Sequence, residues 1–171
     1  MMEIPRVNTL GIIGRFAIAM AAVVVIQGIL AFKFRVFSYF DLPLIYSVYY
    51  GFVLGNPIAS ILIGSGLGLM QDSLSGALLG FNGLSKTLIG FLAASAGTKF
   101  NVDQAITRGV ALFLFSIGDG LLVSILGLTA GSATSTAYGV VLGGWTLSAA
   151  FNTLLGLALF GYYDRFGNAT T

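Results

Sequence analysis

The chain has 171 residues, of which 57% are hydrophobic and only 8% carry a charged side chain. Soluble domains contain about a quarter charged residues, so this composition cannot build a water-facing surface and predicts an integral membrane protein. The net charge of +2 does not favour nucleic acid as a partner, and the absence of cysteine and histidine excludes disulfides, thiolate metal sites and the commonest general base. We therefore expect no enzyme, no catalytic residues, no metal and no cofactor.

The first apolar run covers residues 16–32. It ends without a small-x-small cleavage motif, because Phe32 follows Ala31, so we expect a retained anchor rather than a signal peptide. Little sequence flanks the apolar runs on either side. We therefore expect one transmembrane domain over residues 1–171.

The segment from residue 42 to residue 71 is uncharged and long enough for one kinked helix. Gly55, Asn56 and Pro57 interrupt it, and proline starts helices well but interrupts them badly. We expect two short helices that meet at this turn, each only some 20 Å long against a hydrocarbon core of about 30 Å. In total, the sequence predicts six spans. They cover residues 16–32, 42–54, 57–72, 86–98, 109–128 and 139–163.

The basic residues indicate an orientation. With six spans both termini share one side of the membrane, and that side collects more Lys and Arg than the other. The first side has Arg6, Arg15, Lys99, Arg108 and Arg165, and the other has Lys33 and Arg35, with Lys86 at its border. Because cytoplasmic loops are enriched in Lys and Arg, we expect both termini in the cytoplasm.

Small residues mark the faces on which transmembrane helices touch, since close backbone approach, rather than the hydrophobic effect, drives their association. Gly64, Gly68 and Asp72 are spaced by four residues, and so are Lys86 and Gly90, so each set lies on one helix face. We expect the three glycines to be helix-packing positions. Antiparallel packing of the two helices would bring Asp72 and Lys86 to the same end, facing each other.

The pairing of Asp72 with Lys86 has two interpretations, a polar lock that shapes a pocket or partner surface, or a structural pair where both side chains reach water. We favour the second, because interfacial charges cost less than central ones. Asp119 lies near the centre of its span, where an aspartate costs about 2.5 to 3.5 kcal/mol. It must face the bundle, a cavity or a partner, and Gln27 and Asn152 are its candidate hydrogen-bond partners.

The segment from Asp41 to Ala93 combines several motifs in a fixed order. An acid and a proline open the second span as Asp41-Leu42-Pro43, a turn with Gly and Pro follows, and the patterns GxxxGLxxDxxxG and LGxNxLxxxLxGxLA come next. These patterns fall on Gly64, Gly68, Leu69, Asp72 and Gly76, then on Leu79, Gly80, Asn82, Leu84, Leu88, Gly90, Leu92 and Ala93. This ordered set resembles the MreD family of bacterial rod shape-determining membrane proteins, although the acid and the proline are inverted here.

The resemblance implies an all-α integral membrane protein, a bundle of about six short transmembrane helices that is similar to the S components of energy-coupling-factor transporters. It also implies a non-enzymatic, multi-pass scaffold subunit of the cell-elongation (rod) complex in the bacterial inner membrane, which supports peptidoglycan synthesis and rod shape. The implied partner is an MreC-like single-span protein and, through it, RodA, a class B penicillin-binding protein, MreB and RodZ. Membrane lipid is the other expected partner.

Four polar residues are candidates for the polar lock or partner surface: Asp72, Asn82, Lys86 and Asp119. In the scaffold interpretation, Gly64, Gly68 and Gly90 admit the helix of a partner. The alternative function is a substrate-binding S component of a vitamin transporter. A third interpretation, a proton-coupled carrier, rests on Asp119 alone.

Overall fold

The computed structural model describes residues 9–34, 39–75, 79–100, 102, 104–130 and 142–167, with side chains from residue 18 to residue 162 of these ranges, except 142 and 143. Within them the fold is all-helical with six helices and no strand, as the sequence predicts. The helices are α1 (Thr9–Lys33), α2 (Leu42–Leu54), α3 (Pro57–Ser75), α4 (Phe81–Gly97), α5 (Ala105–Thr129) and α6 (Leu142–Gly167). Arg6, Arg35, Gly76 and residues 139–141 of the expected sixth span lie outside the described residues.

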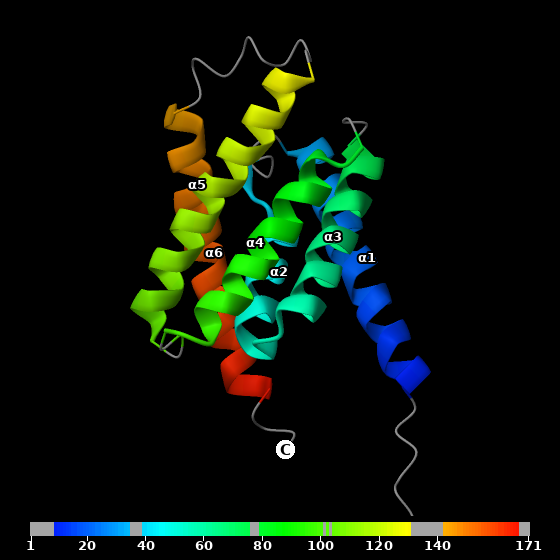
Figure 1. Cartoon of the computed structure of the whole chain (residues 1–171), viewed down its shortest axis with the longest axis vertical. Coiled ribbons are helices and arrows are strands. Elements are labelled where there is room, and N and C mark those ends of the chain that lie inside the picture. The colour runs from blue at the N-terminus through cyan, green and yellow to red at the C-terminus, as the bar shows by residue number, and fades with distance from the viewer. Residues whose placement is uncertain are drawn as a thin grey trace, which may run out of the picture.

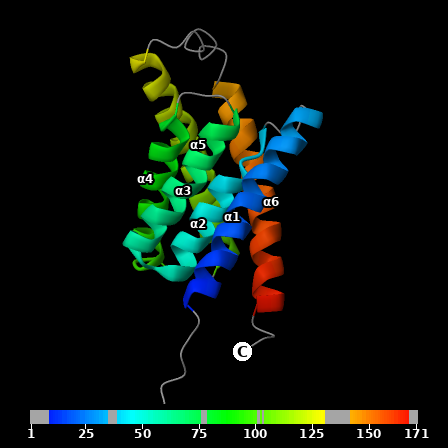
Figure 2. The same ribbon diagram turned by 90° about the vertical axis from the view of Figure 1, so that its right-hand side faces the viewer.

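The helices run alternately up and down a single bundle (Figures 1 and 2). The start of α1, the turn between α2 and α3, and the end of α6 lie at its lower end in Figure 1. With 13 residues, α2 is about 20 Å long, roughly half the length of the 25-residue α5. Its first turn therefore lies inside the bundle, and a non-helical segment that includes Phe40 and Asp41 leads into it.

Despite its length, α2 is the central helix, since it contacts each of the other five. Its buried face contributes Leu44, Ile45, Val48 and Phe52 to the hydrophobic core. The remaining core residues come from α4, α5 and α6, and they are Ile89, Ala93, Leu112 and Phe160. The start of α2 is therefore fixed by packing on all sides.

The chain forms two helices, rather than one kinked helix, on either side of Gly55 and Asn56. Gly55 ends α2 in the left-handed conformation, with φ of 54°, which a residue without a side chain adopts at little cost. The Asn56 side-chain oxygen accepts hydrogen bonds from the backbone N–H groups of Ile58 and Ala59, at 3.0 and 3.3 Å, and so caps α3. Pro57 is the first residue of α3, where its missing N–H costs nothing.

The backbones of α3 and α4 touch through glycine. A side-chain carbon built on Gly64 would lie 2.2 Å from the carbonyl oxygen of Lys86, and one on Gly68 would lie 2.3 Å from that of Asn82. A carbon on Gly90 would lie 2.7 Å from the carbonyl oxygen of Ser60. All three positions therefore exclude any side chain, and the two antiparallel helices pack at the closest distance that backbones allow.

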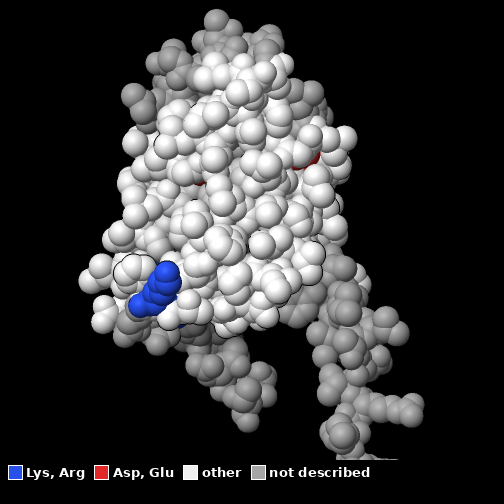
Figure 3. Space-filling model, in the orientation of Figure 1, with Lys and Arg blue, Asp and Glu red and all other residues white. Residues whose placement is uncertain are grey.

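The face of the bundle seen in Figure 3 carries very few charged side chains. Every helix exposes at least one large hydrophobic side chain, for example Ile29, Val53, Ile58, Leu84, Ile106 and Leu154. Among the described residues, two helical segments are long and apolar enough to cross a membrane, Ala105–Thr129 and Gly144–Tyr162. Such a surface is suited to lipid, because water-soluble monomers rarely expose contiguous apolar areas this large.

Candidate functional site

A buried lysine is the centre of the candidate site. Lys86 lies in the second turn of α4 and its side chain is fully buried. Its ammonium nitrogen is 2.9 Å from a carboxylate oxygen of Asp41 and 3.6 Å from one of Asp119. It also donates a hydrogen bond of 3.2 Å to the side-chain oxygen of Asn82. The ammonium thus hydrogen-bonds to α4 itself and forms ion pairs with a carboxylate of α5 and with the carboxylate of the residue that precedes α2.

Asp41 ties the start of α2 to α4. One carboxylate oxygen accepts a hydrogen bond of 2.9 Å from the backbone N–H of Leu44 and so caps α2, and the other pairs with Lys86. A negative charge at this position also stabilises the positive end of the helix dipole. The sequence analysis did not select Asp41 as a site residue. The sequence did contain a signal for this role. An acid just before a helix that has proline in its first turn, as Asp41 and Pro43 are placed here, is a typical N-cap pattern.

The non-helical backbone before α2 is satisfied by side chains of α1 and α6. Gln27 donates to the carbonyl of Phe40 at 2.9 Å and accepts from the N–H of Leu42 at 2.7 Å. Asn152 accepts from the N–H of Asp41 at 2.8 Å. In lipid, unpaired backbone groups are costly, and irregular backbone is tolerated only where protein supplies its hydrogen bonds. These two amides supply them here.

Asp119 is buried in the bundle, and its partners differ from those expected. It accepts a hydrogen bond of 2.6 Å from the Ser85 hydroxyl, besides its pairing with Lys86. The expectation that Gln27 and Asn152 bond to Asp119 is wrong. Gln27 bonds to the backbone before α2, and Asn152 accepts from that backbone and donates to the Ser116 hydroxyl at 3.3 Å. Nothing in the sequence singled out Ser85, which is one small polar residue among many.

Asp72 caps α4 from the neighbouring helix α3. Its two carboxylate oxygens accept hydrogen bonds from the backbone N–H groups of Gly80, Asn82 and Gly83, at 2.8, 3.2 and 3.1 Å, and from the side-chain amide of Asn82 at 2.8 Å. The N-cap residue of α4, Gly80, has no side chain of its own to do this. The carboxylate of Asp72 therefore lies where the N-terminus of α4 would bind an anion.

Asp72 and Lys86, which we expected to face each other at the same end of the two helices, do not form an ion pair. The lysine pairs with Asp41 and Asp119, and only Asn82 links the two expected partners, since its amide group donates to Asp72 and its oxygen accepts from Lys86. The expectation that both charges reach water at the membrane surface is wrong as well, because Asp72 is 1% exposed and Lys86 is 0% exposed.

The partner surface expected at Gly64, Gly68 and Gly90 is also corrected. The chain's own α3–α4 contact fills these positions, as the distances of 2.2 to 2.7 Å to backbone oxygens require. A second helix cannot approach the same faces. The small-residue pattern identified a contact between helices, but the contact is within the chain.

The arrangement joins four helices through charge. Asp41, Lys86 and Asp119 connect α2, α4 and α5, and Asn82 extends the connection to Asp72 on α3. Ion pairs are strong in a low-dielectric interior, and removal of one partner leaves an uncompensated charge. Within the described part of the chain, no group of three or more Asp or Glu side chains is placed to hold a metal ion. The geometry is that of a lock between helices.

The fold and this lock define a small helical membrane protein whose few charges hold its own helices together. The family model described as rod shape-determining protein MreD matches residues 9–166, nearly the whole chain. The chain therefore belongs to the MreD family of rod shape-determining membrane proteins. No curated protein and no solved structure matches it significantly.

Proposed function

We propose that this protein is a non-enzymatic scaffold subunit of the bacterial rod complex, which binds an MreC-like single-span protein in the inner membrane. Through that partner it supports peptidoglycan synthesis by RodA and a class B penicillin-binding protein, in concert with MreB and RodZ. The observation that carries the proposal is the family match over residues 9–166. No observation favours the vitamin-binding alternative.

The bonding of the buried charges supports a scaffold over a carrier. Lys86 and Asp119 bond to each other and to neighbouring side chains, and Asp72 bonds to the start of α4. Every one of these contacts joins one part of the fold to another. Groups engaged in this way hold the shape of the protein, which is what a subunit that presents a fixed surface to partners requires.

We also propose a multi-pass topology with both termini in the cytoplasm. The start of α1 and the end of α6 lie at the same end of the bundle. Arg15, Lys99, Arg108 and Arg165 belong to the helix segments and connection nearest that end, whereas Lys33 ends α1 at the opposite one. The excess of basic residues favours the cytoplasm for the end that carries the termini. A reporter that is active only outside the cytoplasm, fused after residue 171, should be inactive, and an active fusion would reverse the topology.

The function is tested by depletion and co-purification. Depletion of the protein should turn rods into rounded cells, and the full-length protein should co-purify with its single-span partner. Normal rods after depletion, or tight binding of a vitamin by the purified protein, would overturn the proposal.

The same assay can locate the partner face. At Gly28, Gly118 and Gly161 a side-chain carbon would meet no atom of the described chain within 4 Å. The first side-chain carbon of a leucine at these positions meets none of the chain's own atoms, so loss of the partner in a variant that remains folded would mark the face. Gly64→Leu is the contrasting variant, which should unfold the bundle itself.

A further inference from the structure

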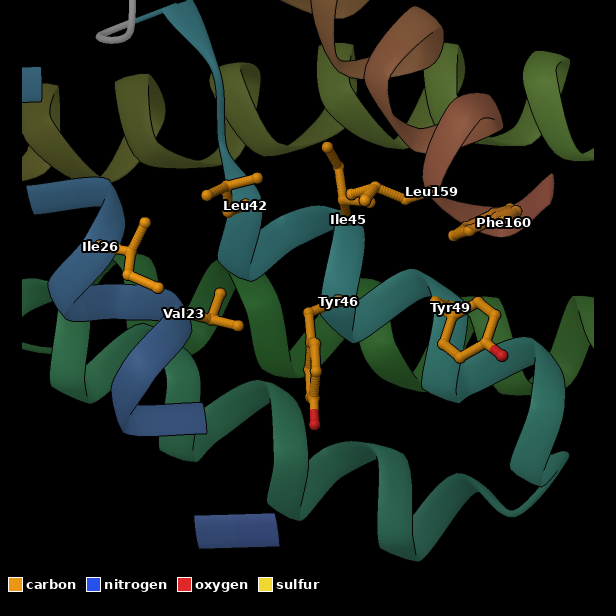
Figure 4. A pocket seen from close by; sticks show the side chains of 8 residues that line it. All are labelled: Val23, Ile26, Leu42, Ile45, Tyr46, Tyr49, Leu159 and Phe160. Carbon is orange, nitrogen blue, oxygen red and sulfur yellow. The ribbon is translucent and has the colours of Figure 1, made fainter. Parts of the chain in front are cut away.

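An apolar groove opens between α1 and α6. In the described part of the chain these two helices do not contact each other, and α2 forms the floor between them (Figure 4). The groove has a volume of about 190 Å³. Its walls include Val23 and Ile26 of α1, Ile45 and Tyr49 of α2, and Leu159 and Phe160 of α6.

A second hollow beside the groove is lined by a basic residue. This hollow has a volume of about 190 Å³, shares Tyr49 and Phe160 with the groove and is lined by Arg108 near the start of α5. The guanidinium carbon of Arg108 lies 5.7 Å from the centre of the Phe160 ring, and its Nε donates a hydrogen bond to the carbonyl of Val102. These contacts hold the positive charge at the end of the groove that lies towards the start of α1 and the end of α6.

We propose that the groove binds one anionic phospholipid of the bilayer, with an acyl chain against α2 and the phosphate at Arg108. The charge of the groove is complementary to this ligand, because its long part is apolar and its end is cationic. An arginine is well suited to phosphate, which it can bind through two parallel N–H groups.

The size of the groove suits a lipid chain. A volume of 190 Å³ equals that of about six water molecules, which suits a stretch of a single acyl chain. With the termini in the cytoplasm, Arg108 would face the leaflet that carries anionic lipids. The binding itself does not depend on that orientation or on the scaffold function.

The test measures which lipid stays with the purified full-length protein. The probes are dioleoyl phosphatidylglycerol and dioleoyl phosphatidylcholine, added in equal amounts and counted by native mass spectrometry. We expect retention of one phosphatidylglycerol with about tenfold preference, the factor that a charge-assisted hydrogen bond supplies. Arg108→Gln should bring the preference close to one. Lys99→Gln, which removes an exposed basic residue that does not line the groove, should leave it unchanged.

Two further variants keep the proposal falsifiable if Arg108→Gln does not fold. Arg108→Lys retains the charge and should retain a preference for phosphatidylglycerol. Leu159→Trp fills the apolar part of the groove and should reduce retention of both lipids. Equal retention of the two lipids by the wild type, an equal loss with Lys99→Gln, or unchanged retention with Leu159→Trp would overturn the proposal.

Discussion

Replacement of Lys86 by methionine is expected to destabilise the protein by about 3 to 5 kcal/mol, the cost of leaving buried charge without its partner. Methionine is close to lysine in length and fills a similar volume, so the variant removes the ammonium with little change in packing. What remains is two carboxylates, those of Asp41 and Asp119, whose side chains are only 17% and 11% exposed.

The distances show why the effect is large. At an effective dielectric constant of 20, a unit charge pair at 2.9 Å attracts by about 6 kcal/mol and one at 3.6 Å by about 5 kcal/mol. Desolvation of the ions offsets much of this attraction in the intact cluster. Removal of the lysine takes away the attraction and leaves the desolvation of both carboxylates in place. The neutral triple variant Asp41→Asn, Lys86→Met, Asp119→Asn removes both the attraction and the desolvation cost. Its free energy of unfolding should be within about 2 kcal/mol of that of the wild type.

Reversible unfolding in mixed detergent micelles measures these differences. The single variant should be less stable than the triple variant. Lys99→Met is the matched control, because Lys99 is exposed, and its stability should equal that of the wild type within about 0.5 kcal/mol. A single variant within 1 kcal/mol of the wild type, or a triple variant less stable than the single one, would refute the reasoning.

Three other substitutions test the remaining contacts by the same unfolding assay. Gly64→Ala should cost about 1 to 3 kcal/mol, because the new carbon would lie 2.2 Å from a backbone oxygen, whereas Gly28→Ala, which meets nothing within 4 Å, should be neutral or slightly stabilising. Asp72→Ala should cost at least about 2 kcal/mol, since three N–H groups at the start of α4 lose their acceptor. Gln27→Leu should cost about 2 to 4 kcal/mol through two unpaired backbone groups, but Gln71→Leu should cost almost nothing, since the buried Gln71 side-chain oxygen has no hydrogen-bond partner. Equal effects within either matched pair, or a neutral Asp72→Ala, would contradict these contacts.

The local features of the fold could be read from the sequence. Gly55, Asn56 and Pro57 determine the break between α2 and α3 through their own backbone preferences, which need no distant partner. The spacing of Gly64 and Gly68 marks one face of a helix, and that face does pack at backbone contact. What the spacing cannot specify is whether the helix on the other side belongs to the same chain.

The predicted start of α4 was wrong because Lys86 was taken as the border of the membrane span. The sequence analysis began this span at Lys86, on the assumption that a charge marks a membrane border. The helix begins at Phe81, five residues earlier, because Asp72 caps it from α3. The shift moves Lys86 to the interior, where the partner of its ammonium is an acid 45 residues earlier in the chain.

The roles of Gln27 and Asn152 depend on tertiary structure. A polar residue in an apolar run indicates that some buried polar group needs a partner, but the sequence does not say which one. Asp119 was the visible candidate, whereas the groups that needed partners were the backbone N–H and C=O of Phe40, Asp41 and Leu42. These backbone groups need side-chain partners because α2 is short and begins inside the bundle. The residues just before it are not helical and so lack hydrogen bonds within a helix.

The most direct test of the central claim, that the buried charges hold a scaffold together and take no part in transport, is the shape of cells that contain only a variant protein. In cells depleted of the wild type, the neutral triple variant of Asp41, Lys86 and Asp119 should restore rods at normal abundance, whereas Lys86→Met alone should not. Rounded cells with a folded and abundant triple variant would contradict the account, because the charges would then do more than hold helices in place.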